Sequence, residues 1–231
     1  MNPRLAFLPW LTAVSAVVCI AASLGMLASG LAFVFKPLTT LLVIAYAWPR
    51  GAGVPKQRRL ILVGLFLSLT GDVSLLWPKA GFLPGLVSFL LAHLAYIAAF
   101  CVPVRFAARP GAFVAYAVLA SAILSQLWSG VPAALCAPVL AYVICLAAMA
   151  AQAAVWWRCA PGDARARRAA IGGFLFLASD SLLAFNKFAA PLPLSALWIL
   201  TSYWLAQWCI ASTLERPALE ATTAPAERSF P

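Results

Sequence analysis

The sequence has few charged residues and almost no histidine. Only 10% of its 231 residues are Asp, Glu, Lys or Arg, and His93 is the single histidine. One histidine cannot build the three-histidine zinc site of ceramidase-type membrane hydrolases, so we expect no metal. The chain also lacks a G-x-S-x-G elbow, an H-E-x-x-H motif, a P-loop and a dinucleotide fingerprint. These absences exclude the common serine, zinc and nucleotide-dependent mechanisms, and we expect no cofactor.

Hydrophobic residues, in contrast, make up 65% of the chain, and its mean hydropathy is +0.97. Soluble domains are only about 45–50% apolar, so the lipid bilayer must solvate most of this chain. The formal net charge of +10 does not predict nucleic-acid binding, because the basic residues form short clusters between apolar runs rather than one charged face. We therefore expect a multi-pass integral membrane protein.

The apolar sequence divides into eight runs. A bilayer core about 30 Å thick needs roughly 20 apolar residues per helix, and Gly, Pro and basic clusters separate runs of this length. The predicted fold class is an all-α bundle of about eight transmembrane helices, formed by residues 1–214. A disordered cytoplasmic tail, residues 215–231, should follow. The expected helices are Leu5–Leu24, Leu31–Trp48, Leu60–Trp77, Phe82–Cys101, Ala112–Trp128, Ala133–Trp157, Ala169–Phe185 and Leu194–Leu214.

The loops differ strongly in charge. Basic residues precede the first expected helix and follow the second, fourth, sixth and eighth, whereas the other loops carry only Lys79 and Lys187. Because basic loops stay in the cytoplasm, both termini are predicted to be cytoplasmic.

The third and seventh expected helices resemble each other. Residues 66–76 read F-L-S-L-T-G-D-V-S-L-L, and residues 174–184 read F-L-F-L-A-S-D-S-L-L-A. Each places an acid among small residues, four helices apart and in the same direction. This pattern suggests a tandem 4+4 parallel repeat, although the other helix pairs show little similarity.

Three charged residues, Lys36, Asp72 and Asp180, fall inside the expected spans. Each costs at least about 2.5–3.5 kcal/mol near a helix centre, so each should face the bundle interior with a partner. All three lie five residues from the outer end of a helix, which places them in one layer ~7–8 Å below the non-cytoplasmic boundary. Further candidates to line the same cavity or its rim are His93, Asn186, Lys187, Tyr203 and Gln207.

A lysine beside only one of two buried acids would drive their pKa values apart. One protonated acid and one carboxylate suit hydrolysis through an oxocarbenium-like intermediate. Two other interpretations remain open at this point. Intramembrane charges also occur in proton-coupled transporters and lipid-binding membrane proteins, and Lys36 could form a purely structural ion pair in a scaffold.

Four motifs carry a resemblance to a known family. K-P-L-T-T begins at Lys36, G-D-V-S-L at Gly71, S-D-S-L-L-A-F-N-K-F at Ser179 and Y-W-L-A-Q at Tyr203. In this order, over nearly the whole chain, they resemble the YhhN-like membrane family of bacterial and animal lysoplasmalogenases. The resemblance implies cleavage of the vinyl ether bond of lysoplasmalogens to a fatty aldehyde and glycerophosphoethanolamine or glycerophosphocholine. It assigns the family's two acids to Asp72 and Asp180.

The resemblance also predicts the partners and roles of the site. A lysophospholipid substrate and membrane lipids are expected, without nucleic acid, in a bacterial inner membrane. One aspartic acid would protonate the vinyl ether, while the other would stabilise the cation and activate water. Lys36, the lysine of the family's K-P motif, would separate the two pKa values or hold the lipid phosphate. Asn186, Lys187 and Tyr203 are candidates for headgroup binding.

Overall fold

The computed structural model describes residues 7–77 and 79–215, and the regular structure in this part of the chain is helical. Eight α-helices follow one another, with two short 3-10 turns between the fifth and the sixth. They are α1 (Leu8–Ser23), α2 (Gly30–Ala47), α3 (Pro55–Ser74), α4 (Phe82–Phe100), α5 (Pro110–Leu127), η2 (Trp128–Gly130), η3 (Ala133–Leu135), α6 (Cys136–Cys159), α7 (Ala164–Phe188) and α8 (Ser195–Ala211).

Each expected run overlaps one α-helix, which confirms the all-α prediction. The clearest differences are that α3 and α7 each begin five residues before the apolar run that predicted them. Pro55 begins α3 because its fixed φ suits the first helical turn. Asp163 caps α7 by accepting a hydrogen bond from the Arg165 backbone N–H at 2.8 Å. The predicted start at Leu5 and almost all of the predicted tail lie outside the described residues.

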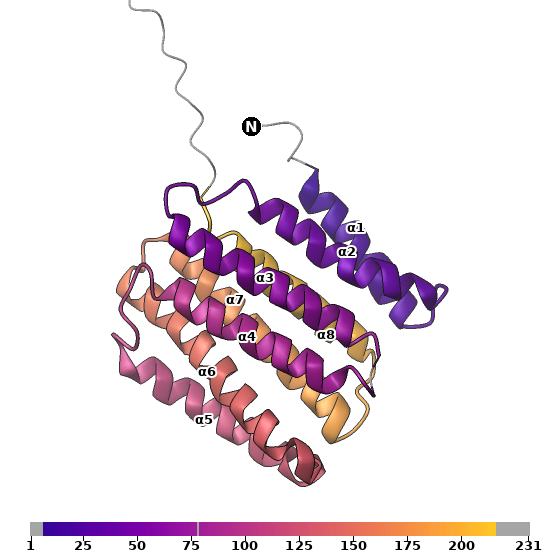
Figure 1. Ribbon diagram of the computed structural model, residues 1–231. Coiled ribbons are helices and arrows are strands. Elements are labelled where there is room, and N and C mark those ends of the chain that lie inside the picture. The colour runs from indigo at the N-terminus through magenta and orange to yellow at the C-terminus, as the bar shows by residue number, and fades with distance from the viewer. Residues whose placement is uncertain (1–6, 78, 216–231) are drawn as a thin grey trace, which may run out of the picture.

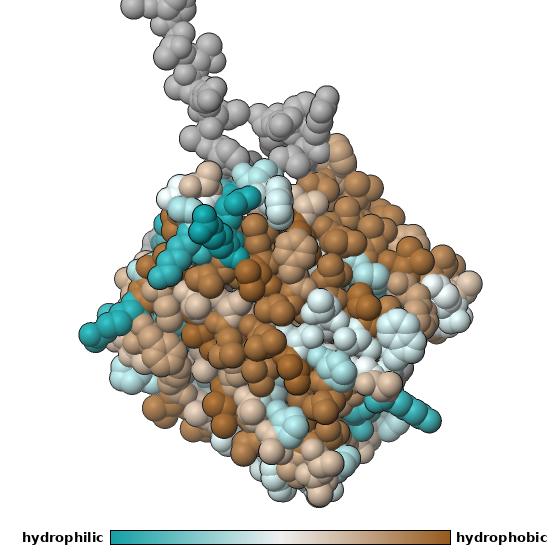
Figure 2. All heavy atoms as spheres, in the orientation of Figure 1, coloured by the Kyte–Doolittle hydropathy of each residue, from teal (hydrophilic) through white to brown (hydrophobic). Residues whose placement is uncertain are grey.

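Within residues 7–77 and 79–215, five helices are long and apolar enough to cross a membrane. They lie at Gly30–Ala47, Phe82–Phe100, Pro110–Gly130, Ala133–Cys159 and Ala164–Phe188, whereas α1 is apolar but shorter. Hydrophobic residues cover most of the face shown in Figure 2, and hydrophilic ones gather near its ends. The chain is thus a multi-pass integral membrane protein.

The helices run alternately up and down (Figure 1). The connections α2–α3, α4–α5 and α6–α7 lie at the upper left of Figure 1, which we call the basic end because their arginines and lysines gather there. The connections α1–α2, α3–α4 and α7–α8 lie at the opposite end. The most extensive packing joins α3 to α4, α7 to α8, α1 to α2 and α6 to α7.

Glycines allow two of these helix pairs to approach closely. A Cβ added to Gly64 of α3 would overlap the Tyr96 ring of α4, and one added to Gly172 of α7 would lie 2.9 Å from Ile210 Cγ1 of α8. Small residues at such crossings let two backbones come together in a membrane. Each glycine lies eight residues before an intramembrane acid, so these crossings help to fix how α3 and α7 present their acids.

Candidate active site

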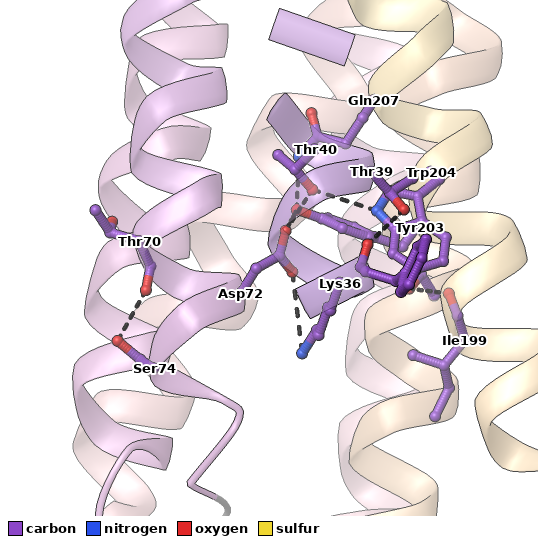
Figure 3. Close-up of polar contacts among 12 residues, drawn as sticks. Lys36, Thr39, Thr40, Thr70, Asp72, Ser74, Ile199, Tyr203, Trp204 and Gln207 are labelled. Carbon is purple, nitrogen blue, oxygen red and sulfur yellow. Dashed lines mark hydrogen bonds and ion pairs between the residues drawn. The ribbon is translucent and has the colours of Figure 1, made fainter. Parts of the chain in front are cut away.

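Asp72 of α3 is 1% exposed and accepts hydrogen bonds from two neighbouring helices. The Thr40 hydroxyl of α2 donates to Oδ2 at 2.6 Å, and the Tyr203 hydroxyl of α8 donates to the same oxygen at 2.8 Å (Figure 3). Lys36 Nζ lies 4.0 Å from Oδ1. Every one of these partners is a donor or a cation, so the site is complementary to an ionised carboxylate.

Further hydrogen bonds from Trp204 and Gln207 orient these donors (Figure 3). Trp204 Nε1 donates to the Thr40 hydroxyl at 3.2 Å, and Gln207 Nε2 donates to the Tyr203 hydroxyl at 3.2 Å. The Tyr96 hydroxyl in turn donates to Gln207 Oε1 at 2.7 Å. Gln207 therefore accepts a hydrogen bond from Tyr96 and donates one to Tyr203, whose own hydroxyl proton is directed to Asp72. Buried networks of this kind hold their side chains in one arrangement.

Asp180 of α7 lies in a separate cluster. The Tyr142 hydroxyl of α6 donates a hydrogen bond to Asp180 Oδ2. The Tyr142 ring also packs edge-on against His93 of α4, with 5.3 Å between ring centroids. Asp180 therefore depends on α6 for its partner, as Asp72 depends on α2 and α8.

A cavity of about 870 Å³, including its open mouth, lies beside Asp180. Asp180 and Lys187 are the charged residues of its described lining, and nearly all the other lining residues are apolar. The cavity is lined by Leu75, Phe82, Leu86, Phe89, Ala120, Ile123, Leu124, Leu127, Val131, Val139, Tyr142, Val143, Leu146, Leu177, Asp180, Ser181, Leu183, Ala184, Lys187 and Phe188.

Lys187 lies at the rim of this cavity, near the end opposite the basic end. Its Nζ is 4.1 Å from the centroid of the Phe82 ring, a cation–π contact with another residue of the cavity lining. Lys187 follows Asp180 by seven residues, so both lie on one face of α7, roughly 10 Å apart along its axis. The cavity thus has an acid along its length and a cation at its rim.

Aromatic rings separate the two acids. Phe89 lines the cavity and packs edge-on against Tyr203 at 5.8 Å and against Phe176 at 6.2 Å between centroids. Tyr203 carries the hydroxyl that bonds Asp72, and neither Tyr203 nor Asp72 belongs to the cavity lining. The two acids belong to adjoining clusters rather than to one shared pocket wall.

The structure brings several of the candidate residues together. Lys36 is paired with Asp72, and Tyr203 and Gln207 bond each other and support the same acid. Asp180 and Lys187 share the neighbouring cavity.

His93 and Asn186 have other surroundings. His93 is fully buried between Tyr142 and Phe176, and within the part of the chain that the structure describes neither ring nitrogen has a hydrogen-bond partner. Asn186 Oδ1 accepts from the Leu192 backbone N–H at 2.9 Å, which braces the α7–α8 connection.

Two side chains that contact the candidate site were not among the predicted site residues. Tyr142 carries no charge and lies in an uninterrupted apolar run, so only its position in the fold distinguishes it. Trp204 adjoins Tyr203 in the Y-W-L-A-Q motif, but tryptophans elsewhere in the chain mark membrane interfaces. Its hydrogen bond to Thr40 is visible only in the tertiary structure.

Known proteins resemble this chain along most of its length. The model of the YhhN family matches residues 31–214. Human lysoplasmalogenase TMEM86B is 34% identical over 193 residues, which cover 82% of this chain and 78% of the human protein. The pig protein of the same name is 34% identical over 186 residues, 80% of this chain and 75% of the relative. A lysoplasmalogenase of Mycobacterium tuberculosis is 32% identical over 167 residues, 67% of this chain and 59% of the relative. No solved structure matches the chain.

Proposed function

Because the chain belongs to the YhhN family, we propose that it is a lysoplasmalogenase. It hydrolyses the vinyl ether bond of lysoplasmalogens to a fatty aldehyde and glycerophosphoethanolamine or glycerophosphocholine. The relatives named lysoplasmalogenase support this activity. The structural observation that carries it is the apolar cavity, in which Asp180 is the acid and Lys187 the cation.

The cavity matches the three parts of such a lipid. The apolar walls from α4, α5 and α6 accommodate the alkenyl chain. Asp180 faces the vinyl ether, and Lys187 at the rim binds the phosphate. In the lipid, the glycerol backbone connects the vinyl ether to the phosphate. In the protein, Asp180 and Lys187 correspondingly lie on one face of α7. Asn186 supports the rim, because it braces the loop that follows Lys187.

Asp180 is the proton donor in this proposal, because it is the acid that lines the cavity. Its carboxylic proton moves to the β-carbon of the vinyl ether, and the C=C π electrons form the new C–H bond. The resulting oxocarbenium ion is attacked by water, and the Asp180 carboxylate takes a proton from that water. The hemiacetal then collapses as its C–O bond to glycerol breaks. The hydroxyl group of the hemiacetal loses its proton, and the departing glycerol oxygen gains one. The fatty aldehyde is then released.

Asp72 has a different role, since it is not among the residues that line the cavity. The two hydroxyl donors and Lys36 hold it as a fixed carboxylate. Its negative charge favours the oxocarbenium ion across a low-dielectric interior, where such preorganised charges act strongly. Gln207 positions Tyr203, and His93 supports the ring of Tyr142.

We also propose that all eight helices cross the bacterial inner membrane, with both termini in the cytoplasm. The alternating course of the helices and the basic end support this topology. Two features support a 4+4 repeat. The α2 residue Thr40 bonds the α3 acid, as the α6 residue Tyr142 bonds the α7 acid. In addition, α3 packs on α4 and α7 on α8 through Gly64 and Gly172.

Aldehyde release from lysoplasmenylethanolamine by the purified protein tests the function. We expect wild-type turnover, and a loss of roughly 10²–10⁴-fold in Asp180→Asn, the usual contribution of general acid catalysis. Asp72→Asn should also lose most of its activity. Asp163→Asn, the same chemical change at the basic end, is the matched control and should keep full turnover.

Two results would contradict the proposal. Unchanged aldehyde release in Asp180→Asn would exclude this acid as the proton donor. Proton-dependent flux of lipid into liposomes without any aldehyde would identify a transporter instead.

A further inference from the structure

The apolar cavity beside Asp180 is too shallow for a whole alkenyl chain. Because α7 runs from the basic end toward the rim, residues before Asp180 lie deeper in the bundle than the acid. Leu177, the innermost α7 residue of the lining, precedes Asp180 by three residues, roughly 4.5 Å along the helix axis. An alkenyl chain spans roughly 15 Å, because two lipid chains end to end fill a hydrocarbon core about 30 Å thick. Most of the chain therefore does not fit beyond Asp180.

The floor of the cavity is closed at a similar depth on the neighbouring helix. Leu146, the innermost α6 residue of the lining, lies four residues beyond Tyr142, roughly 6 Å toward the basic end. Deeper still, α6 and α7 come into contact, since a Cβ added to Gly173 would lie 3.0 Å from Ala150 Cα. The chain cannot continue between these two helices, so it must leave the cavity through a side.

Three of the four sides are sealed by packing. The helix α6 packs extensively on both α4 and α5. Between α4 and α7, Phe89 contacts Phe176 edge-on, and Phe82 contacts Phe188 edge-on with 5.8 Å between ring centroids. Leu75 of α3 adds to the lining as well. These sides offer no route to the bilayer.

The fourth side, between α5 and α7, is the least packed. The contact between these two helices is small compared with that between α5 and α6. The chain segments meet closely at the rim, where a Cβ added to Gly130 would overlap the Phe188 carbonyl oxygen. Farther in, Ala120 and Leu124 of α5 and Ala184 of α7 line the cavity. The two helices thus stand on either side of the cavity along most of its depth.

This side also faces lipid. The helix α5 is the least buried of the five that are long and apolar enough to cross a membrane, and it lies at the edge of the bundle in Figure 1. The bilayer therefore surrounds α5 except where it packs on α6 and borders the cavity. A hydrocarbon chain that passes between α5 and α7 enters an environment as apolar as the cavity wall, so its exit costs little.

We propose that the alkenyl chain leaves the cavity sideways between α5 and α7, and that most of it stays in the bilayer. The cavity then recognises the vinyl ether and the first few carbons, but not the total chain length. This inference rests on the proposed function, because it takes a lysoplasmalogen as the substrate. It assigns the small specificity of the site to the part of the lipid between Lys187 and the innermost lining residues.

Competition between two chain lengths tests the proposal in the wild-type protein. Lysoplasmenylethanolamines with hexadecenyl and octadecenyl chains are mixed in the same phosphatidylcholine vesicles as the full-length protein, and both aldehydes are quantified by mass spectrometry. We expect the two kcat/KM values to agree within about twofold. A pocket that encloses the chain end would discriminate each methylene by roughly 10–200-fold, so a ratio of that size would overturn the proposal. Absence of both aldehydes would instead overturn the proposed function.

Ala120→Phe tests the exit route. Ala120 lies ten residues before Gly130, and Asp180 lies eight before Phe188, so the two are within about one helical turn in depth. A phenyl ring there narrows the side between α5 and α7. We expect kcat/KM for the hexadecenyl lipid to fall at least 10-fold, and that for a butenyl analogue, whose chain stays inside the cavity, to fall less than about threefold.

Ala122→Phe is the matched control, because Ala122 is an exposed residue of α5 outside the cavity lining. It should leave kcat/KM for both lipids within about twofold of wild type. An equal loss with the long and the short lipid in Ala120→Phe would overturn the exit between α5 and α7, since the obstruction would then lie at the vinyl ether itself. Should Ala120→Phe fail to fold, the competition between chain lengths in wild type decides the proposal alone.

Discussion

The hydroxyl of Tyr142 donates a hydrogen bond to the Asp180 carboxyl on the neighbouring helix, where both side chains line the apolar cavity. This contact orients the one acid that faces the proposed substrate. Asp72, in contrast, is enclosed by Thr40, Tyr203 and Lys36. The two acids thus have different surroundings, which assigns them different roles in the proposed reaction.

Tyr142→Phe should lower kcat roughly 10-fold to 100-fold while leaving KM nearly unchanged. The variant keeps the ring that forms the cavity wall but removes the hydrogen bond that orients Asp180, and losses of about 1–3 kcal/mol are typical of such changes. Steady-state kinetics of aldehyde release measures the effect. Tyr116→Phe on α5, outside the cavity lining, is the control. A rise in KM at constant kcat would show that Tyr142 binds substrate instead.

Thr40→Val should reduce both stability and turnover. The change leaves a similar shape but removes a buried donor to Asp72, and it leaves Trp204 Nε1 without its acceptor. We expect a destabilisation of about 1–3 kcal/mol, measured by unfolding in detergent.

Thr39→Val is the matched control for this variant. Thr39 is equally buried on α2, but its hydroxyl bonds the Phe35 carbonyl oxygen and Ser15 rather than an acid. The control should lose stability without a comparable loss of kcat. If both variants lost kcat equally, the effect of Thr40 would be due to helix packing and not to Asp72.

Lys187→Gln should raise KM for lysoplasmenylethanolamine about 10-fold with little change in kcat. The substitution removes the cation at the cavity rim, which the proposed phosphate contacts in both the ground state and the transition state. Raising the salt concentration should reduce the difference from wild type, because ions screen an exposed charge. Lys79→Gln removes the same charge at the same end of the bundle, away from the cavity, and should keep the wild-type KM.

Asp163 should make the stability of the protein depend on acidic pH. The hydrogen bond from the Arg165 side chain holds the pKa of Asp163 below its ordinary value. The stability that it contributes is therefore present above the unfolded pKa of about 3.9 and is lost as pH falls through the lower folded value. Asp163→Asn keeps a helix cap but loses the ion pair, so it should be about 0.2–1 kcal/mol less stable at pH 7.

Thermal unfolding at pH 7 and pH 3 measures this difference. The midpoints of wild type and Asp163→Asn should differ by about 1–4 °C at pH 7 and converge at pH 3. A constant difference at both pH values would show that the ion pair does not contribute. Asp163→Gln, a poorer helix cap, should remain less stable than Asp163→Asn at both pH values.

The sequence predicted the helices well, and it singled out charged residues as candidates for the site. Runs of apolar residues located each helix, and the intramembrane charges identified Lys36, Asp72 and Asp180. The i, i+4 spacing of Tyr203 and Gln207 predicted that they share a face, and they bond each other. The early starts of α3 and α7 were missed, because helix-initiating residues extend both helices into polar loops where hydropathy gives no signal.

The tertiary structure alone decided which groups meet. The cost of placing a charge in the bilayer depends on one side chain and its depth, so the sequence alone could single out the acids as candidates. Partner choice depends instead on how each helix is rotated about its axis and how closely neighbouring helices pack. Those variables are set by contacts between distant segments, such as Gly64 against Tyr96. They place Asp72 within its hydrogen-bond network and Asp180 beside Tyr142 in the cavity.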